Sequence, residues 1–341
     1  MMPEIITIDR FLELSAKYPV VDVRSPIEFA HASFPGAISF PLMNNEERAI
    51  IGTTFKQEGR SAAVLKGYEI IGPKFSAYLK EAISIFPEKK VVMYCWRGGL
   101  RSNIMSFLFE TADIKVFLLK GGYKAYRNKT FELLEQPLPI WVLGGMTGSG
   151  KTKILKELSL IGETIIDLEA LACHKGSAFG GLGEAPQPGY EQFENLLALE
   201  IYKATGSNRV WVENESRMIG KVKIPDAFYS QMRTAQVIEV ILPEEERIQE
   251  IKNNYCSFPV DTLLECTLKL KKKLGDLRTR QATDALISGN FEDWIKILLV
   301  YYDENYLYSS SLRFADTVTD LSFEKLEPKS IAKRMIQLLQ K

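Results

Sequence analysis

Short apolar runs alternate with longer amphipathic stretches in the first third of the chain. Residues 5–8, 20–24 and 91–94 are compact apolar runs of the kind found in buried strands. Helical patterns follow two of these runs, one beginning at Asp9 as the expected N-cap and one across residues 104–108. Strands that alternate with helices in this way predict an α/β domain with a mainly parallel sheet.

A second alternating set follows residues 131–139, a stretch with two prolines that we interpret as a linker. Strands are predicted beyond it at 140–143, 164–168, 210–217 and 237–243. The rest of the chain is predicted to be helical throughout. We therefore expect two α/β domains, 1–135 and 139–341, the second with a helical C-terminal part.

The composition narrows the class of protein. The chain has 341 residues, 46% hydrophobic and 25% charged, as expected for a two-domain globular protein. Its 43 basic and 43 acidic residues balance, so any RNA site must be a local patch. Four scattered cysteines without paired spacing favour reduced thiols and a cytoplasmic location. No apolar run approaches the roughly 20 residues that cross a bilayer, so no membrane contact is expected.

One cysteine, Cys95, lies in a loop directly after the predicted strand 91–94. Two glycines and the arginines Arg97 and Arg101 surround it, and a helical pattern follows at once. A strand–loop–helix turn directs backbone N–H groups and the positive helix end at whatever the loop encloses. The arginines favour the thiolate, so we predict that Cys95 carries a transferable sulfur or selenium atom. A buried core cysteine is the alternative.

A glycine-rich loop opens the second domain. It reads Gly-x-x-x-x-Gly-Lys-Thr, with a predicted strand before it and a helix after it, which is the context of a P-loop. Glycines let successive amides close around phosphate oxygens, and the lysine adds a positive charge. The threonine is a candidate Mg²⁺ ligand, although no complete metal site is predicted. The expected phosphate-binding residues are Gly145, Gly148, Ser149, Gly150, Lys151 and Thr152.

Further polar residues follow the strands of this domain. Asp167 and Glu169 end the second predicted strand, at the sheet edge where ligands bind in such folds. The glycine-rich stretch 172–183 contains His174 and Lys175, which are candidates for contact with a phosphate or a base.

Two carboxylates end the next predicted strand. After a P-loop, an acidic residue in this place orients Mg²⁺ or its water. Either Glu213 or Glu215 has this role, and the other is free to pair with Arg217.

Two charged segments each allow two interpretations. Residues 268–280 contain six basic side chains, which form either a solvated helix face or an RNA contact. Residues 43–80 are polar and interrupted by glycines, and they form either a surface insertion or a positively charged border to the cysteine pocket.

The first domain resembles the rhodanese family. Four motifs of that family match, in order, residues 21–29, 31–37, 95–102 and 119–123. The resemblance implies that Cys95 forms a persulfide or its selenium counterpart, held by loop amides. It also implies that Arg101 stabilises the loop and the anionic cargo, while Asp22 and Arg24 hold the architecture together.

The whole chain is similar to the bacterial tRNA 2-selenouridine synthases. The similarity lies in residues 95–99, 145–152, 168–177, 213–217 and 301–303. It implies a rhodanese-like domain followed by a P-loop NTPase-like α/β domain. The implied reaction converts wobble 2-thiouridine of tRNA to 2-selenouridine. Selenophosphate supplies selenium, geranyl diphosphate supplies an S-geranyl intermediate, and the partners are tRNA and an enzyme that supplies selenophosphate.

Two other functions remain compatible with these motifs. One is a P-loop kinase or ATP-dependent sulfurtransferase with a sulfur-carrier domain, which would need ATP turnover. The other is a regulatory phosphate-binding module whose first domain only docks partners, in which case Cys95→Ala would be harmless.

Overall fold

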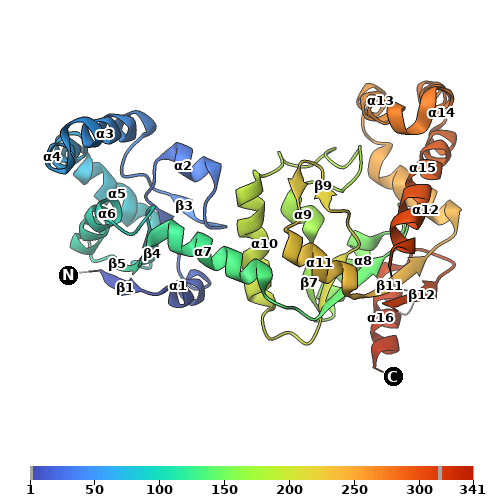
Figure 1. Ribbon diagram of the computed structural model, residues 1–341, viewed down its shortest axis with the longest axis horizontal. Coiled ribbons are helices and arrows are strands. Elements are labelled where there is room, and N and C mark those ends of the chain that lie inside the picture. Colours follow the sequence, from blue (N-terminus) through green and yellow to red (C-terminus); the bar gives the residue numbers. More distant parts are fainter. Residues whose placement is uncertain (1–2, 314–316, 341) are drawn as a thin grey trace. The chain divides into compact units, whose positions relative to one another are not determined.

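The computed structural model describes residues 3–313 and 317–340. The chain divides into two compact units, each with its own five-stranded sheet (Figure 1). The first unit comprises Met1–Leu133 with Glu194–Leu199, and the second comprises Leu134–Phe193 with Glu200–Lys341.

The first unit is built on a parallel sheet, as its alternating pattern predicts. Its strand order is β1-β5-β4-β2-β3, and every neighbouring pair is parallel. Strand β4 lies in the middle and is buried from its second residue onward, which places its carboxyl end at the centre of the sheet edge. The strands are β1 (Glu4–Ile6), β2 (Val20–Asp22), β3 (Ile38–Ser39), β4 (Lys90–Tyr94) and β5 (Lys115–Leu119).

Helix α1 begins earlier than the sequence pattern indicates. The predicted N-cap, Asp9, is wrong, because Thr7 is extended and its hydroxyl accepts a hydrogen bond from the Arg10 amide (3.3 Å). Asp9 instead lies in the first helical turn, where a carboxylate is favourable near the helix N-terminus. Outside residues 43–80, which we call the insertion, the helices are α1 (Ile8–Ser15), α2 (Pro26–His31), α6 (Leu100–Thr111) and α7 (Gly122–Glu135).

Residues 43–80 are mostly helical. Gly59, with φ +89°, separates two helices that pack against each other. A short 3₁₀ turn, Gly72–Lys74, leads into a third helix. Many of their side chains are exposed, but Ile71 and Ala82 reach the core. These helices are α3 (Asn45–Glu58), α4 (Arg60–Ile71) and α5 (Phe75–Ile85).

The second unit also has a fully parallel five-stranded sheet, in the order β12-β11-β6-β8-β7. Strand β6 leads into the predicted phosphate loop and lies between β8 and β11. The loop therefore emerges beside the carboxyl ends of both neighbours. The strands are β6 (Ile140–Gly144), β7 (Thr164–Ile166), β8 (Val210–Glu213), β11 (Gln236–Ile241) and β12 (Val318–Ser322), with a separate hairpin of β9 (Met218–Ile219) and β10 (Val222–Lys223).

Helices α13 to α15 form a helical part of the second unit with its own apolar core, which includes Leu263, Leu286 and Trp294. Helix α16 packs with α8 beside the sheet. The helices of this unit are α8 (Lys151–Leu160), α9 (Leu168–Ala172), α10 (Tyr190–Ala204), α11 (Asp226–Thr234), α12 (Glu244–Tyr255), α13 (Val260–Lys269), α14 (Lys271–Ile287), α15 (Phe291–Ser311) and α16 (Pro328–Leu339).

One sequence prediction in this region is wrong. The C-terminal part is not helical throughout, because β12 pairs with β11 over five residues. The β12 sequence is short, polar and largely exposed, so pairing rather than periodicity makes it a strand.

The division between the two units lies between Leu133 and Leu134, inside the stretch 131–139, and α7 continues to Glu135.

Among the residues that the structure describes, no helix combines the length and apolarity that a bilayer crossing requires.

The packing of α6 predicts a large effect from one core truncation. Phe109 is 0% exposed and packs edge-on against Phe40 with ring centroids 5.3 Å apart, whereas Phe107 is 60% exposed. Phe109→Ala should destabilise the first unit by about 3–5 kcal/mol, and Phe107→Ala by less than about 0.5 kcal/mol. Hydrogen exchange of β4 peptides measures both, and equal effects would contradict this packing.

Candidate functional site

The loop after β4 encloses the Cys95 thiol. The sulfur lies 3.2 Å from the Ser102 hydroxyl and accepts a hydrogen bond from the Gly99 amide (3.4 Å). Both Cys95 and Ser102 are buried. Because α6 starts at Leu100, its N-terminal amides also face this region.

These contacts favour the thiolate. Burial alone would raise the pKa of Cys95, but hydrogen bonds from the Ser102 hydroxyl and from the amides of Gly99 and Arg97 together lower it. The loop therefore provides an anion cradle made mainly of backbone N–H groups. Such a cradle suits a thiolate or an anionic sulfur or selenium atom bound to it.

The two predicted arginines of this loop lie in different surroundings. Arg97 is exposed, and its backbone amide, rather than its side chain, contributes to the thiol's hydrogen bonds. Arg101 forms a two-pronged ion pair with Glu28, with distances of 2.6 and 3.3 Å. Arg48 of α3 lies 3.6 Å from the same carboxylate, so the insertion contributes a positive charge near the loop.

Gly122 lets the start of α7 approach the cysteine loop closely. Gly122 has φ +59°, and a Cβ atom there would collide with the Cys95 carbonyl oxygen. The following amide, Tyr123 N–H, donates to that same oxygen (2.7 Å), and Lys124 N–H donates to the Trp96 carbonyl (3.0 Å). The start of α7 thus fixes the backbone that holds the thiol.

The P-loop of the second unit has the geometry that its motif predicts. Gly145, Gly148 and Gly150 all have positive φ, and α8 begins at Lys151. The Lys151 ammonium group donates to the Gly145 carbonyl (2.7 Å), so it lies across the loop. The loop amides and this lysine form one positively polarised surface.

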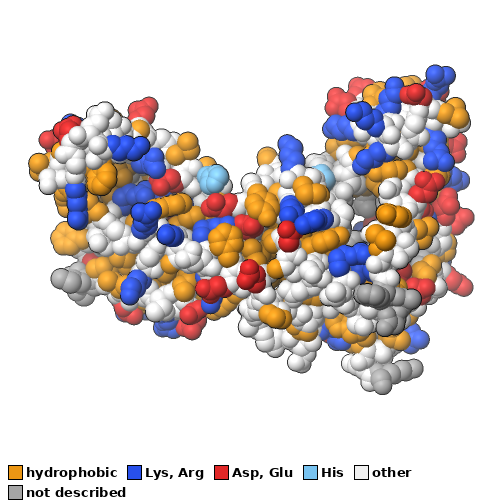
Figure 2. All heavy atoms as spheres, viewed as in Figure 1, with side chains coloured by type: hydrophobic (Ala, Val, Ile, Leu, Met, Phe, Trp, Pro, Cys, Tyr) orange, Lys and Arg blue, Asp and Glu red, His pale blue; other side chains and the backbone are white. Residues whose placement is uncertain are grey.

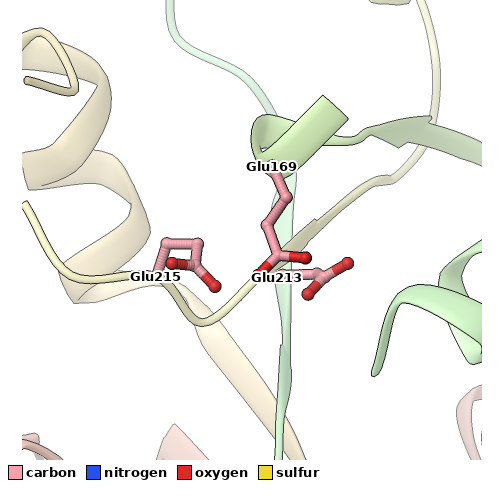
Figure 3. Close-up of side chains that lie close together, drawn as sticks. All are labelled: Glu169, Glu213 and Glu215. Carbon is pink, nitrogen blue, oxygen red and sulfur yellow. The ribbon is translucent and has the colours of Figure 1, made fainter. Parts of the chain in front are cut away.

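Three glutamates converge beside the P-loop (Figure 3). Glu213 ends β8, Glu215 follows two residues later, and Glu169 lies in the first turn of α9. Their carboxylate oxygens lie within 4.8 Å of one another. Thr152 connects the cluster to the P-loop by donating to Glu169 (3.2 Å).

This crowding makes ionisation unfavourable. Burial and then the neighbouring charge of Glu169 raise the pKa of Glu215 to about 8. Burial and the charges of Glu169 and Glu215 raise the pKa of Glu213 well above its ordinary value. The Lys151 charge opposes both shifts without cancelling them.

The cluster fits a divalent cation. One carboxylate oxygen of Glu213 is buried and has no hydrogen-bond partner among the residues that the structure describes. Carboxylate and hydroxyl oxygens are the ligands that Mg²⁺ prefers, and Thr152 adds a hydroxyl beside the carboxylates. A cation there would offset the mutual repulsion of the three glutamates, which raises the pKa values of Glu213 and Glu215. It would also give the unpaired Glu213 oxygen a partner.

A cavity of about 620 Å³ joins these groups to an apolar wall. Its polar lining includes the P-loop and the glutamate cluster, and its apolar lining comes from one packed cluster that includes Phe179, Tyr255, Trp294, Leu298 and Tyr302. A volume in this range suits a small organic ligand. The cavity therefore suits a ligand with a phosphate group at one end and an apolar or aromatic body at the other.

The other predicted residues of the second site are divided between the cavity and the surface. Lys175 lines the cavity and pairs with Glu184 (3.1 Å). His174 accepts a hydrogen bond from the Gly176 amide (3.2 Å) and so shapes the glycine-rich loop. Arg217 pairs with Asp226, not with Glu213 or Glu215, which answers the question left open by the sequence.

Asp167 and Glu169, which the sequence does not distinguish, have different roles in the structure. Asp167 caps α9 by accepting a hydrogen bond from the Ala170 amide (2.8 Å), whereas Glu169 supplies the carboxylate that joins the cluster. The signal was present, since an Asp directly before a helical turn is a preferred N-cap.

The basic segment 268–280 is not one continuous face. It spans the end of α13 and the start of α14, and Gly275 has φ +79° within it. Lys271 pairs with Asp276 (3.2 Å), while Lys273 lines the cavity. Figure 2 shows basic side chains gathered around α13 and α14 with acidic ones among them.

The fold and the two loops together define a class of protein that combines a rhodanese-like domain with a P-loop domain. A model of rhodanese-like domains matches residues 7–129, and a model described as the tRNA 2-selenouridine synthase AAA domain matches residues 138–327.

Individual relatives agree with these matches. The chain is 34% identical over 324 residues to a tRNA 2-selenouridine synthase of Hydrogenovibrio crunogenus, covering 85% of this chain and 88% of that one. It is 34% identical over 350 residues to that of Proteus mirabilis, covering 92% and 95%. The relative from Nitrosomonas europaea is 40% identical over 248 residues, covering 70% of this chain and 64% of the relative. The chain belongs to the tRNA 2-selenouridine synthase family.

The Glu28–Arg101 pair predicts a pH-dependent contribution to stability. Burial would raise the pKa of Glu28, but the hydrogen bond and charge of Arg101 lower it from 4.5 to about 2. The pair therefore stabilises the fold fully above pH 4.5, and this contribution is lost as the pH falls toward 2. Urea denaturation should show Glu28→Gln less stable than wild type by a constant amount at pH 5–8, with a smaller difference at pH 3.5. The exposed control Glu88→Gln should show no such trend, and a difference that is unchanged at pH 3.5 would contradict the pairing.

The glutamate cluster predicts stabilisation by Mg²⁺. Saturating Mg²⁺ should raise the melting temperature of the full chain, and EDTA should reverse the shift, since a ligand at 100 times its Kd adds about 2.7 kcal/mol. Glu213→Gln should abolish most of this shift, whereas Glu245→Gln, an exposed residue of α12, should keep it. Equal Mg²⁺ responses in both variants would show that the cluster does not hold the cation.

Proposed function

We propose that this chain converts wobble 2-thiouridine of tRNA to 2-selenouridine through an S-geranyl intermediate. Geranyl diphosphate and selenophosphate are the substrates beside the tRNA. The observation that carries the proposal is the cavity that is lined both by the P-loop with the glutamate cluster and by an apolar cluster. A diphosphate with an isoprenoid chain matches both parts of that lining.

The first proposed step is alkylation of sulfur. The C2 sulfur of the base attacks C1 of geranyl diphosphate, a C–S bond forms, the C–O bond to diphosphate breaks, and the base loses its N3 proton. The P-loop amides and Lys151 stabilise the negative charge that builds up on the leaving diphosphate. Phe179, Trp294 and Leu298 offer the apolar surface for the geranyl chain.

Glu169, Glu213, Glu215 and Thr152 are the residues that would hold Mg²⁺ near this leaving group. When bound, the cation supplies positive charge that lowers the cost of diphosphate departure. Mg²⁺ is therefore the proposed cofactor of the diphosphate step.

The second proposed step replaces sulfur by selenium. Alkylation turns the thiocarbonyl sulfur into a better leaving group, so a selenium nucleophile adds at C2 and geranylthiol departs. Selenophosphate provides the selenium when its P–Se bond is cleaved by water to phosphate. The Cys95 cradle, with its lowered thiol pKa, supports a role in delivering that selenium, with Arg101 keeping the loop in place through Glu28.

The proposed partners follow from these substrates. They are a tRNA with wobble 2-thiouridine and an enzyme that makes selenophosphate, and the proposed location is the cytoplasm. A P-loop kinase or an ATP-dependent sulfurtransferase is the alternative, because P-loop amides recognise phosphate groups of many ligands.

Two variants separate the proposed steps. Lys151→Ala should lower geranylation of 2-thiouridine tRNA by about a hundredfold, because the lysine stabilises the leaving diphosphate. Cys95→Ala should leave geranylation within about twofold of wild type and reduce selenation strongly. Mass spectrometry of digested tRNA nucleosides measures both products in one assay.

Matched controls exclude general damage. Lys203→Ala, an exposed lysine of α10 that does not line the cavity, and Cys256→Ala, a partly buried cysteine of the second unit, should both retain both activities. ATP-dependent turnover without any geranylated base would favour the kinase alternative, and full selenation by Cys95→Ala would remove the cysteine from the mechanism.

A further inference from the structure

One turn of helix α15 holds two loops of the cavity. Tyr302, Asp303 and Tyr306 lie on this turn. The Tyr302 hydroxyl accepts a hydrogen bond from the Ala178 amide of the glycine-rich loop (3.4 Å). The other two side chains connect to the P-loop at two separate points.

The Tyr306 hydroxyl forms hydrogen bonds to residues in or directly after three neighbouring strands. Its hydroxyl accepts hydrogen bonds from the Gly145 amide (2.7 Å) and the Asn214 side-chain amide (3.3 Å), and it donates to Glu239 (2.6 Å). Gly145 follows β6, Asn214 follows β8, and Glu239 lies on β11. A single hydroxyl therefore fixes the first amide of the P-loop to the two strands that flank it.

Gly144 provides the room for this junction. A Cβ atom at position 144 would collide with the Glu239 carboxylate and would lie 3.1 Å from the Tyr306 hydroxyl. The φ value of Gly144 is not in the left-handed region, so close approach rather than backbone conformation requires this glycine.

Asp303 holds the P-loop at a second point through Arg247. Both carboxylate oxygens of Asp303 accept hydrogen bonds from the Arg247 guanidinium, each at 2.8 Å. The same guanidinium donates to the Thr147 carbonyl oxygen (3.2 Å). Arg247 is only 6% exposed, so this contact is shielded from water.

A loop with three positive-φ glycines needs such external contacts. Gly145, Gly148 and Gly150 leave the unbound loop with many accessible backbone conformations, and ordering it opposes ligand binding. Contacts at Gly145 and Thr147 restrict the loop before a ligand arrives.

We propose that Tyr306 and Asp303 are positioning residues that hold the P-loop in its phosphate-binding conformation. They act through the loop backbone and through Arg247, not by contact with the phosphate. The proposal rests on the proposed function only in taking the loop to bind a diphosphate.

The first test compares Tyr306→Phe with wild type in the full chain. Inorganic diphosphate with Mg²⁺ is the probe, and isothermal titration calorimetry measures its Kd. The variant lacks the hydroxyl that bonds Gly145, Asn214 and Glu239, and this loss of loop order should weaken binding by about tenfold. Tyr308→Phe, two residues along the same helix and 70% exposed, should bind as wild type does.

A second readout distinguishes positioning from general stability. Hydrogen exchange of peptides covering residues 144–150 should accelerate in Tyr306→Phe without any ligand, while peptides of α10, whose described residues have no hydrogen bond to Tyr306, should exchange as in wild type. In kinetics, KM for geranyl diphosphate should rise while KM for tRNA stays within about twofold.

The Asp303 contact has an independent test. Asp303→Asn should weaken diphosphate binding by about fivefold, and the double variant Asp303→Asn/Arg247→Gln should be no weaker than Arg247→Gln alone, because both changes break one contact. Glu304→Gln, exposed on the same helix, is the matched control.

The outcomes separate this proposal from the proposed function. Unchanged loop exchange and diphosphate Kd within twofold of wild type in both Tyr306→Phe and Asp303→Asn would overturn the positioning role. If wild type binds no diphosphate, the diphosphate step of the proposed function fails, and the exchange measurement still decides the positioning role. If Tyr306→Phe does not fold, Asp303→Asn decides it alone.

Discussion

Both candidate sites depend on one interaction, the binding of an anion by backbone N–H groups at the carboxyl end of a central parallel strand. In the first unit β4 leads through the Cys95 loop into α6, and in the second β6 leads through the P-loop into α8. Amides can surround an anion only where side chains do not intervene. Both loops therefore rely on glycines at crowded places, as Gly122 and Gly144 illustrate.

The two units manage their charges in opposite ways. In the first, Glu28 is matched by Arg101 with Arg48 nearby, so the carboxylate is stabilised without any ligand. In the second, three glutamates crowd together and one Glu213 oxygen lacks a partner among the described residues. A satisfied ion pair is typical of framework, whereas an unsatisfied buried carboxylate costs stability and is typical of a site completed by a ligand.

The local motifs were predictable from the sequence, and the contacts between distant residues were not. The Gly-x-x-x-x-Gly-Lys-Thr loop and the cysteine loop are contiguous, so their spacing alone predicts strand, loop and helix. Tyr306 and Gly145 are 161 positions apart, and no periodicity indicates that they meet. Asp167 and Glu169 were not distinguished for the same reason, because α9 turns one of them toward the cap and the other toward Thr152. Strand β12 was missed because its exposed, polar pattern becomes a strand only through pairing with β11.

We propose that one chain performs both the alkylation and the selenium exchange on the same base. The most direct measurement incubates the purified protein with 2-thiouridine tRNA and omits geranyl diphosphate or selenophosphate in turn, followed by mass spectrometry of the nucleosides. We predict 2-selenouridine when both are present, S-geranyl-2-thiouridine when only geranyl diphosphate is present, and unmodified 2-thiouridine when only selenophosphate is present. The absence of both products under every combination would contradict the proposal that this chain performs the two steps.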